Sequence, residues 1–524
     1  MRRSWWGWGW EDQAVEGKDL EAIAAGLAAR FPDGPPPSPR PAPELSSIDI
    51  ADPRVSAPSS LGAVCSTDRR DRAAHTYGKS FRDVVRAVAG DFGVAPDVVA
   101  HPTDETELAA VLEWCAGSRL AAVPFGGGSS VVGGVEGGAA RDAWNGVVSV
   151  DVTGLSGLVE LDRTSRAARV RAGTFGPDLE DLLRPHGLTM RHFPQSFEHS
   201  TVGGWVATRS GGHFATRYTH IDDLVESVRV VTPAGTLETR RLPGSGAGPS
   251  PDRLFLGSEG ILGVVTEAWL RLQDRPVHRA TAAVRFTSFE AGAAATRAVV
   301  QSGLAPANCR LLDPAEAAGS GGKGAAVLLL GFESAVLPVD MLGAQALQIC
   351  LDHGGEAPDG LRSSSTEGTS GAWRSSFMRA AYGRDAVARL GWVVETFETA
   401  CLWSRFDELD TAVRAAVEGV LRSAHGGSVS CRFTHVYPDG PAPYYTVMAP
   451  ATQGTQLGLW DEIKAAAGEA IIASGGTITH HHAVGRDHRP WYDQQRPQLF
   501  ADALAAAKST LDPAGVMNPG VLIG

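Results

Sequence analysis

Three consecutive histidines, His480, His481 and His482, stand in the stretch "TITHHHAV" near the carboxyl end of the chain. Imidazoles can bind a metal ion or exchange protons near neutral pH. The stretch is predicted to be a strand, in which His480 and His482 face one way and His481 the other. Side chains arranged in that way cannot converge on one ion. The pattern therefore predicts no metal site, and it leaves proton transfer or a plain surface or core position as alternatives.

One tyrosine and two arginines are further candidates: Tyr444 in "PAPYYTVMAP", Arg384 in "YGRD" and Arg310 in "CRLLD". A tyrosine whose ordinary pKa is about 10 needs nearby donors or positive charge to act as a base. The plain alternative places its hydroxyl in water or on a backbone carbonyl. Each arginine could simply pair with the aspartate that follows it closely in the sequence.

Three loops rich in small residues could hold a ligand: "PFGGGSS" at 124–130, the stretch 194–212, and "GSEGILGVV" at 257–265. Bare glycine backbone can turn tightly and aim N–H groups at a pyrophosphate, and hydroxyls add uncharged donors. The first loop fits neither a Walker A nor a Rossmann fingerprint. Any single loop could be an ordinary turn. Because all three join strands of one α+β segment, together they favour one extended ligand such as a dinucleotide.

The elements that must position these residues form an α+β pattern. Residues 1–90 are expected to be a helical extension and linker, with helical spacing from Leu20 to Phe31 followed by "PDGPPPSPRPAP". Short strands alternate with helices over 91–276. A second set of strands and helices covers 277–495, and a last helix lies within 496–524. This organisation predicts two α+β domains.

Composition excludes several classes of protein. With 524 residues, 43% apolar residues and a net charge of -12, the chain is globular, has room for more than one domain, and is not expected to bind nucleic acid. Its six scattered cysteines contain no C-x-x-C pair, which predicts neither a zinc site nor a disulfide framework. The start "MRRSWWGWGWED" lacks an apolar signal core. Its tryptophans could touch a membrane interface or pack against the folded body.

The motifs "PFGGGSS", "STVGGWVATRSGG", "GSEGILGVVTEA" and "LDPAGVMNPGVL" resemble those of the vanillyl-alcohol oxidase superfamily of FAD-binding proteins. Within it, "APANCRLLDP", "YGRDAVARLGWVVETFETACLW", "CRFTHVYPDGPAPYY" and "GGTITHHHAVGRD" are similar to the alkyldihydroxyacetonephosphate synthase family. The resemblance implies a two-subdomain FAD-binding domain of the PCMH type at 91–276. It also implies an α+β substrate-binding cap domain at 277–495 with an antiparallel sheet flanked by helices, and a C-terminal segment that returns to the FAD site.

The resemblance implies a noncovalent FAD, because no histidine stands in the first glycine loop, where some relatives tether the flavin. Where the family usually has aspartate this chain has Gln195, which can still form hydrogen bonds but brings no negative charge. The implied cofactor contacts are Pro124, Phe125, Gly126, Gly127, Gly128, Ser129, Ser130, Gln195, Ser196, Phe197, Glu198, His199, Ser200, Thr201, Thr208, Arg209, Ser210, Gly211, Glu259, Gly260, Ile261, Leu262, Gly263, Val264 and Val265.

The resemblance also implies the chemistry: the acyl group of acyl-dihydroxyacetone phosphate is exchanged for a fatty alcohol through a flavin N5 adduct, without net redox. Tyr444 would be the acid and base, supported by His480, His481 and His482, while Tyr445 should face the opposite side. Arg384 would hold the substrate phosphate, and Arg310 would have a supporting catalytic role.

Two other functions remain open at this point. The first is a flavin-dependent dehydrogenase or oxidase of a 2-hydroxy acid or an alcohol, which shares the cofactor domain. The second, suggested by the tryptophan-rich start, is a noncatalytic membrane-associated scaffold. The expected partners are lipid substrates, a second copy of the chain in a homodimer, and no nucleic acid. The expected location is the cytoplasm, with peripheral contact at the inner membrane as an alternative.

Overall fold

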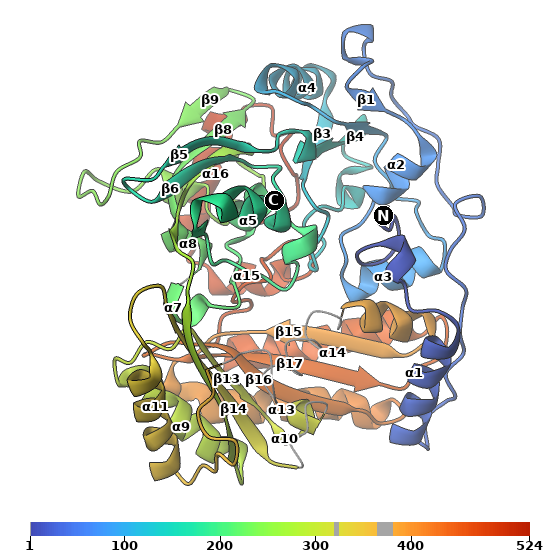
Figure 1. Ribbon diagram of the computed structural model, residues 1–524. Coiled ribbons are helices and arrows are strands. Elements are labelled where there is room, and N and C mark those ends of the chain that lie inside the picture. Colours follow the sequence, from blue (N-terminus) through green and yellow to red (C-terminus); the bar gives the residue numbers. More distant parts are fainter. Residues whose placement is uncertain (1, 219, 319–323, 364–380, 524) are drawn as a thin grey trace.

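The computed structural model describes residues 2–218, 220–318, 324–363 and 381–523. Two halves lie one above the other in Figure 1: a half built on two sheets, and a half built on one large antiparallel sheet. Helix α1 (Gly17–Arg30) runs beside the large sheet. None of the described helices is both long and apolar enough to cross a membrane.

The first sheet has the order β1-β2-β4-β3, and its strands β2, β4 and β3 are parallel. Helix α4 packs on β3, and Val148, Val150, Leu108 and Leu112 are buried in the core between them. The parallel crossover places the end of β3, and therefore the first glycine loop, at one edge of the sheet. The bounds are β1 Cys65–Ser66, α2 Arg69–Ala74, α3 Phe81–Val88, β2 Val98–Ala100, α4 Glu105–Ser118, β3 Leu120–Phe125 and β4 Gly146–Asp151.

The second sheet is antiparallel, with the order β5-β6-β10-β8-β9. Helix α6 packs on β10 and carries the buried Trp205 into the core of this subdomain. The elements are β5 Leu158–Asp162, β6 Ala167–Arg171, α5 Gly176–Leu183, β7 Leu188–Thr189, α6 Val202–Thr208, α7 Ala215–Tyr218, α8 Ile221–Leu224, β8 Val225–Thr232, β9 Gly235–Glu238, β10 Val264–Arg271 and β11 Gln273–Asp274.

The third sheet is fully antiparallel, with the order β12-β14-β13-β16-β17-β15 and helices packed against it, as the family resemblance implied. The strands are β12 His278–Phe286, β13 Asn308–Leu312, β14 Ala326–Ser334, β15 Val393–Glu398, β16 Ser428–Val436 and β17 Pro441–Ala449. The helices are α9 Phe289–Gln301, α10 Pro314–Ala318, α11 Asp340–Asp352, α13 Phe406–Ser423 and α14 Gln456–Ala473, and α15 Arg489–Gln495 and α16 Gln498–Leu511 follow.

The tryptophan-rich start packs against the folded body, which was one of the two interpretations of its sequence. Trp5, Trp6 and Trp8 are buried, and the Trp5 ring lies 5.4 Å from the Phe92 ring. The backbone N–H of Trp8 donates to Asp385 Oδ2 at 2.5 Å. The segment therefore ties the two halves together at the rim of a central cavity.

Candidate active site

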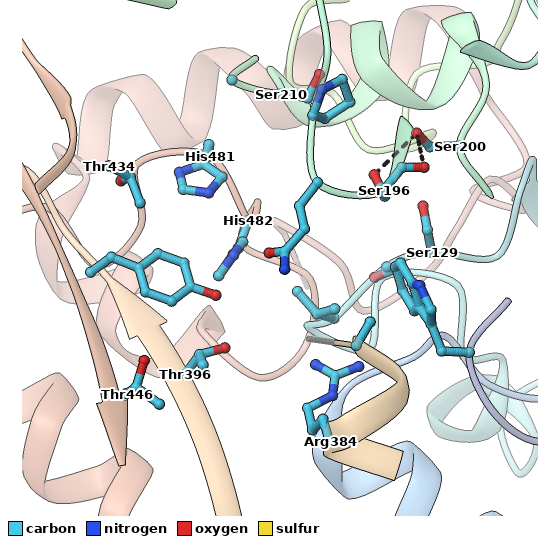
Figure 2. A pocket seen from close by; sticks show the side chains of 18 of the residues that line it. Ser129, Ser196, Ser200, Ser210, Arg384, Thr396, Thr434, Thr446, His481 and His482 are labelled. Carbon is cyan, nitrogen blue, oxygen red and sulfur yellow. Dashed lines mark hydrogen bonds between the residues drawn. The ribbon is translucent and has the colours of Figure 1, made fainter. Parts of the chain in front are cut away.

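A cavity of about 700 Å³ lies where the two halves meet. That size suits a cofactor or a drug-sized ligand. Loops of the first half line one side, and side chains of the large sheet and of the histidine turn, residues 479–482, line the other. Figure 2 shows Ser129, Ser196, Arg384, His481 and His482 around this space.

About half of the predicted cofactor residues line this cavity, and they come from the first and second loops. Gly126 and Gly127 bring these loops into backbone contact: a Cβ on Gly127 would lie 1.8 Å from the carbonyl oxygen of His199. Gly128 has φ +66°, which favours glycine. The predicted residues that line the cavity are Gly126, Gly127, Gly128, Ser129, Ser130, Gln195, Ser196, Ser200, Thr201, Thr208, Ser210 and Gly211.

The other predicted cofactor residues lie outside the main cavity. Phe125 and His199 line a neighbouring cavity of about 240 Å³ on the far side of the first glycine loop. Glu259 is buried, and its carboxylate accepts the N–H groups of Val484 and Gly485 at 2.9 and 2.8 Å. The remaining ones are Pro124, Phe197, Glu198, Arg209, Gly260, Ile261, Leu262, Gly263, Val264 and Val265.

Tyr444 is buried in strand β17 and lines the cavity. The sheet register places it opposite Arg432 on β16 and Glu398 on β15. The Arg432 guanidinium lies 4.0 Å from the centre of the Tyr444 ring. Burial raises the pKa of the Tyr444 hydroxyl, and the positive charge of Arg432 opposes that rise. Tyr445 points the other way, as predicted, and donates to Asp410 at 2.9 Å.

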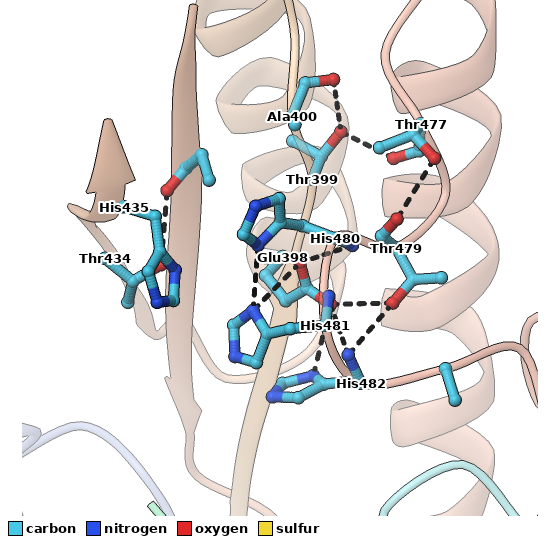
Figure 3. A network of polar contacts seen from close by, with 12 residues as sticks. Glu398, Thr399, Ala400, Thr434, His435, Thr477, Thr479, His480, His481 and His482 are labelled. Carbon is cyan, nitrogen blue, oxygen red and sulfur yellow. Dashed lines mark hydrogen bonds and ion pairs between the residues drawn. The ribbon is translucent and has the colours of Figure 1, made fainter. Parts of the chain in front are cut away.

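The prediction of a strand at "TITHHHAV" is wrong, because these residues form an irregular turn. The cause is Glu398, a fully buried carboxylate that accepts the backbone N–H groups of His480, His481 and His482 at 2.6, 3.0 and 2.9 Å (Figure 3). The hydroxyl of Thr479 donates to it at 2.7 Å. Backbone groups that bond to one carboxylate cannot bond to neighbouring strands.

Because residues 479–482 form a turn and not a strand, the histidines that face the cavity differ from those predicted. His481 and His482 both line the cavity, whereas His480 does not, in contrast to the alternation predicted for a strand. The rings of His481 and His482 lie 6.1 and 5.4 Å from the Tyr444 ring. The premise used against a metal site therefore fails: nitrogen atoms of His435, His480 and His481 lie within 4.8 Å of one another.

Burial keeps these imidazoles neutral near pH 7. It lowers the pKa of His480 and His481 well below the ordinary value and lowers that of His482 to about 4. Burial also opposes the ionisation of Glu398, but the adjacent histidines and the hydrogen bonds that it accepts lower its pKa to about 2. Since the histidines are neutral near pH 7, the hydrogen bonds are the part of this effect that acts there.

The two predicted arginines line the cavity, and neither forms the nearby ion pair of the plain alternative. Asp385, which follows Arg384, accepts the Trp8 N–H, and Asp313 instead pairs with Arg414 at 3.2 Å. The Arg384 guanidinium donates to the carbonyl oxygen of Lys79. Its Nε is buried and has no hydrogen-bond partner among the described residues.

Sequence reasoning missed four residues of the site. Arg432 and His435 lie within the motif "CRFTHVYPDG", where the alternation of strand β16 could have placed Thr434 and Arg432 on the face of Tyr444. Glu398 gives no local signal, because its partners lie 82 to 84 residues away. Trp8 lines the cavity although it belongs to the N-terminal segment.

The lining fits FAD. Two loops offer glycine backbone and seven hydroxyl side chains without a fixed charge, and a Cβ on Gly126 would lie 2.5 Å from Thr201 Oγ1, so the glycines are sterically required. Uncharged donors of this kind bind a pyrophosphate without a lysine. Residues 126–130, together with Gln195, Ser196, Ser200 and Thr201, would therefore hold the cofactor in this cavity.

Comparison with known proteins agrees with this site. A model described as an FAD binding domain matches residues 96–240, and one described as the C-terminal domain of FAD linked oxidases matches 275–522. The alkyldihydroxyacetonephosphate synthases of Dictyostelium discoideum and Caenorhabditis elegans are 28% and 30% identical to this chain. Each alignment covers 87% of this chain, and 78% and 81% of the respective relative.

A solved structure of an alkyldihydroxyacetonephosphate synthase has a TM-score of 0.82 and 23% identity, with 99% of this chain and 98% of that chain covered. It shows the same fold. The fold, the FAD-binding sequence match and the relative at 30% identity agree with one another. The chain therefore belongs to the alkyldihydroxyacetonephosphate synthase family of FAD-dependent enzymes.

Proposed function

We propose that this enzyme exchanges the acyl group of acyl-dihydroxyacetone phosphate for a fatty alcohol. The alcohol oxygen forms the new bond to C1, the bond from C1 to the acyl oxygen breaks, and a fatty acid leaves. No oxidant or reductant is consumed. Near pH 7 the fatty acid ionises, so each turnover also releases one proton. The observation that carries the proposal is a single cavity that unites the FAD loops with Tyr444, two neutral histidines and Arg384.

Two arginines would bind the polar end of the substrate. Arg384 lines the cavity, and its planar guanidinium suits the oxygens of a phosphate group. Arg310 is 2% exposed, lines the same cavity and donates to the carbonyl oxygen of His213 at 3.5 Å. We assign Arg310 a supporting role in orienting the dihydroxyacetone part.

Tyr444 would take the proton from C1 and return it after the exchange. It needs a stabilised phenolate for this role, and Arg432 supplies positive charge 4.0 Å from its ring. His481 and His482 lie beside the same ring and bring polar groups without charge. Glu398 fixes both histidines through their backbone N–H groups.

Bound FAD would supply an electron-accepting ring that supports the replacement at C1. The hydrocarbon tails need a dry channel, and the cavity has an apolar arm near helix α1. It is lined by Ile23 and Leu27 of α1, together with Val387, Val394 and Met448. A lipid tail along this arm would keep water from the reacting carbon.

The test is exchange with a labelled fatty alcohol, in which label must enter the ether product only when acyl-dihydroxyacetone phosphate is present. Tyr444→Phe should reduce turnover by ~100-fold or more, because a general base contributes that much, and should retain FAD. Tyr445→Phe is the matched control, since it removes a buried phenol hydroxyl on the opposite face. Near-normal exchange by Tyr444→Phe would show that another group is the base.

A second measurement separates exchange from hydroxy-acid oxidation. Anaerobic mixing with D-lactate or glycolate should leave the flavin absorbance unchanged. Rapid bleaching by a hydroxy acid, together with no label incorporation, would replace the proposed exchange by a dehydrogenase reaction.

A further inference from the structure

A row of four side chains leads from the cavity to the outside of the protein. His481 Nδ1 lies 3.1 Å from His480 Nδ1, and His480 Nε2 lies 2.9 Å from the Tyr437 hydroxyl. That hydroxyl lies 2.9 Å from His220 Nε2, and His220 Nε2 also lies 3.0 Å from His480 Nε2. Figure 3 shows the inner part of this row, from His481 to His480.

The two ends of the row face different surroundings. His481 lines the cavity, whereas Tyr437 and His220 do not line it and are nevertheless partly exposed. Tyr437 is followed by the exposed residues Pro438 and Asp439. The row therefore runs from the cavity to partly exposed side chains that lie beside the exposed residues 438–439.

Counting hydrogens shows that the row can exist in two forms. A neutral imidazole has one N–H donor and one acceptor nitrogen, and a phenol can donate one hydrogen bond while it accepts another. In the first form, His220 donates to Tyr437, Tyr437 donates to His480, and His480 donates to His481. In the second form every bond is reversed, so that His481 donates to His480, His480 to Tyr437, and Tyr437 to His220.

The two forms differ by one proton transfer along every bond. If a proton arrives at His481 Nε2 from the cavity, each bond can pass one proton outward, and one proton leaves at His220. No bond between heavy atoms changes. The row must be neutral at rest for this to operate, and burial lowers the pKa of all three histidines.

We propose that His481, His480, Tyr437 and His220 form a relay that exports the proton released in each turnover. This inference rests on the proposed function, because acyl exchange produces one proton in a cavity that the lipid tails close to water. The Tyr437 hydroxyl contacts both His480 and His220, whose Nε2 atoms also lie 3.0 Å apart, so His480 can pass the proton outward through Tyr437 or directly to His220. His480 and His220 are positioning and relay residues that do not touch the substrate.

A metal ion is the competing use of the same nitrogen atoms, since those of His435, His480 and His481 lie within 4.8 Å. The relay is favoured because contacts of 2.9 to 3.1 Å already join each member to the next in a chain. It also explains the participation of Tyr437, which lies outside the group of three histidines.

The test variant combines Tyr437→Phe with His220→Phe, which keeps both rings aromatic and removes both outer partners of His480. We expect kcat to fall ~10-fold with KM unchanged, a larger solvent deuterium isotope effect, and partial rescue by added imidazole, because proton export becomes limiting. Tyr445→Phe should change none of these quantities. Unchanged kcat and isotope effect in this double variant would overturn the relay. Loss of wild-type activity in dipicolinate that Zn²⁺ restores would overturn it in favour of a metal site.

A second readout does not depend on turnover. In protein with ¹⁵N-labelled histidine, the His220 and His480 nitrogen shifts should move together in Tyr437→Phe, because both rings lose one shared partner, and should stay in place in Tyr445→Phe. Unmoved shifts would contradict the relay. Absence of label exchange in the wild-type enzyme would refute the proposed function instead, so the two failures are distinguishable.

Discussion

Replacing Glu398 by glutamine tests whether this carboxylate holds the histidine turn. One of its oxygens accepts the Thr479 hydroxyl and the N–H groups of His481 and His482, and the other accepts the N–H of His480. Glutamine carries one oxygen and one amide NH₂ group. Whichever way the amide is oriented, its NH₂ group faces at least one backbone N–H donor.

The loss in free energy of unfolding caused by Glu398→Gln follows from these hydrogen bonds. In the better orientation the glutamine oxygen takes the position that accepts three hydrogen bonds. The hydrogen bond from the His480 N–H to a charged acceptor is then lost, and this N–H is left buried without a partner. Together these changes should lower the free energy of unfolding by ~3 kcal/mol. The lowered pKa of Glu398 is no separate measure of this cost, because the charges of His482 and His480 are its largest lowering causes and these imidazoles are neutral near pH 7. The figure describes a fully buried group.

The pH dependence of this loss has a definite sign. A carboxyl whose pKa is lowered in the folded protein stabilises it above its ordinary pKa, and this stability is lost as the pH falls from 4.5 towards 2. The difference between wild type and Glu398→Gln should therefore be constant from pH 6 to pH 8. A difference that grew or shrank in this range would point to histidine titration instead.

The assay is urea unfolding at pH 6, 7 and 8, combined with label exchange at pH 7. Glu395→Gln is the matched control, because Glu395 is buried on the same strand and bonds to Trp460 and Lys464 at 2.6 and 3.2 Å, away from the cavity. Both variants should lose stability, but only Glu398→Gln should lose exchange while keeping FAD. A loss below ~1 kcal/mol, or normal exchange, would refute the role of Glu398.

Two further predictions concern the FAD-binding half. Gly127→Ala should fold but lose most of its bound FAD, which is measured as lost flavin absorbance. A Cβ at this position would lie 1.8 Å from the carbonyl oxygen of His199 and must push the two loops apart. Full flavin content in the purified variant would contradict this prediction. His75 is buried, which lowers its pKa, but Asp151 at 3.1 Å, Asp71 and the hydrogen bonds to them raise it to about 9. The ion pairs stabilise the fold below pH 6.5, and this stabilisation is lost as the pH rises towards 9. His75→Gln should therefore lower the free energy of unfolding in urea by ~3 kcal/mol at pH 6 and by clearly less at pH 9.5. Equal losses at both pH values would exclude the pairing.

Local patterns predicted the glycine loops and the direction of Tyr444. Gly128 has a positive φ that other residues rarely adopt, so its place in a turn follows from residue type alone. Tyr444 and Tyr445 alternate across a regular strand, and the two faces could be assigned from the period of two. In these cases the information lies within a few residues of the site.

The directions of the three histidines could not be predicted in this way. Their backbone leaves the strand conformation because Glu398, more than 80 residues earlier, accepts three successive N–H groups. The burial of Trp8 beside Asp385 depends on a contact across 377 residues. Such positions are set by tertiary partners, which periodicity does not reveal.

The charged and the neutral groups around Tyr444 have different effects on its proposed role as a base. The sequence suggested that imidazoles tune Tyr444, but burial makes these imidazoles neutral, so they bring no positive charge to the phenol. The positive charge near the phenol comes from Arg432, which is itself paired with Glu316 at 2.9 Å. This pair keeps the buried guanidinium compensated while its face lies against the tyrosine ring. Tyr444 therefore lies beside neutral imidazoles and one compensated cation, and among these groups the positive charge that favours its phenolate comes from Arg432.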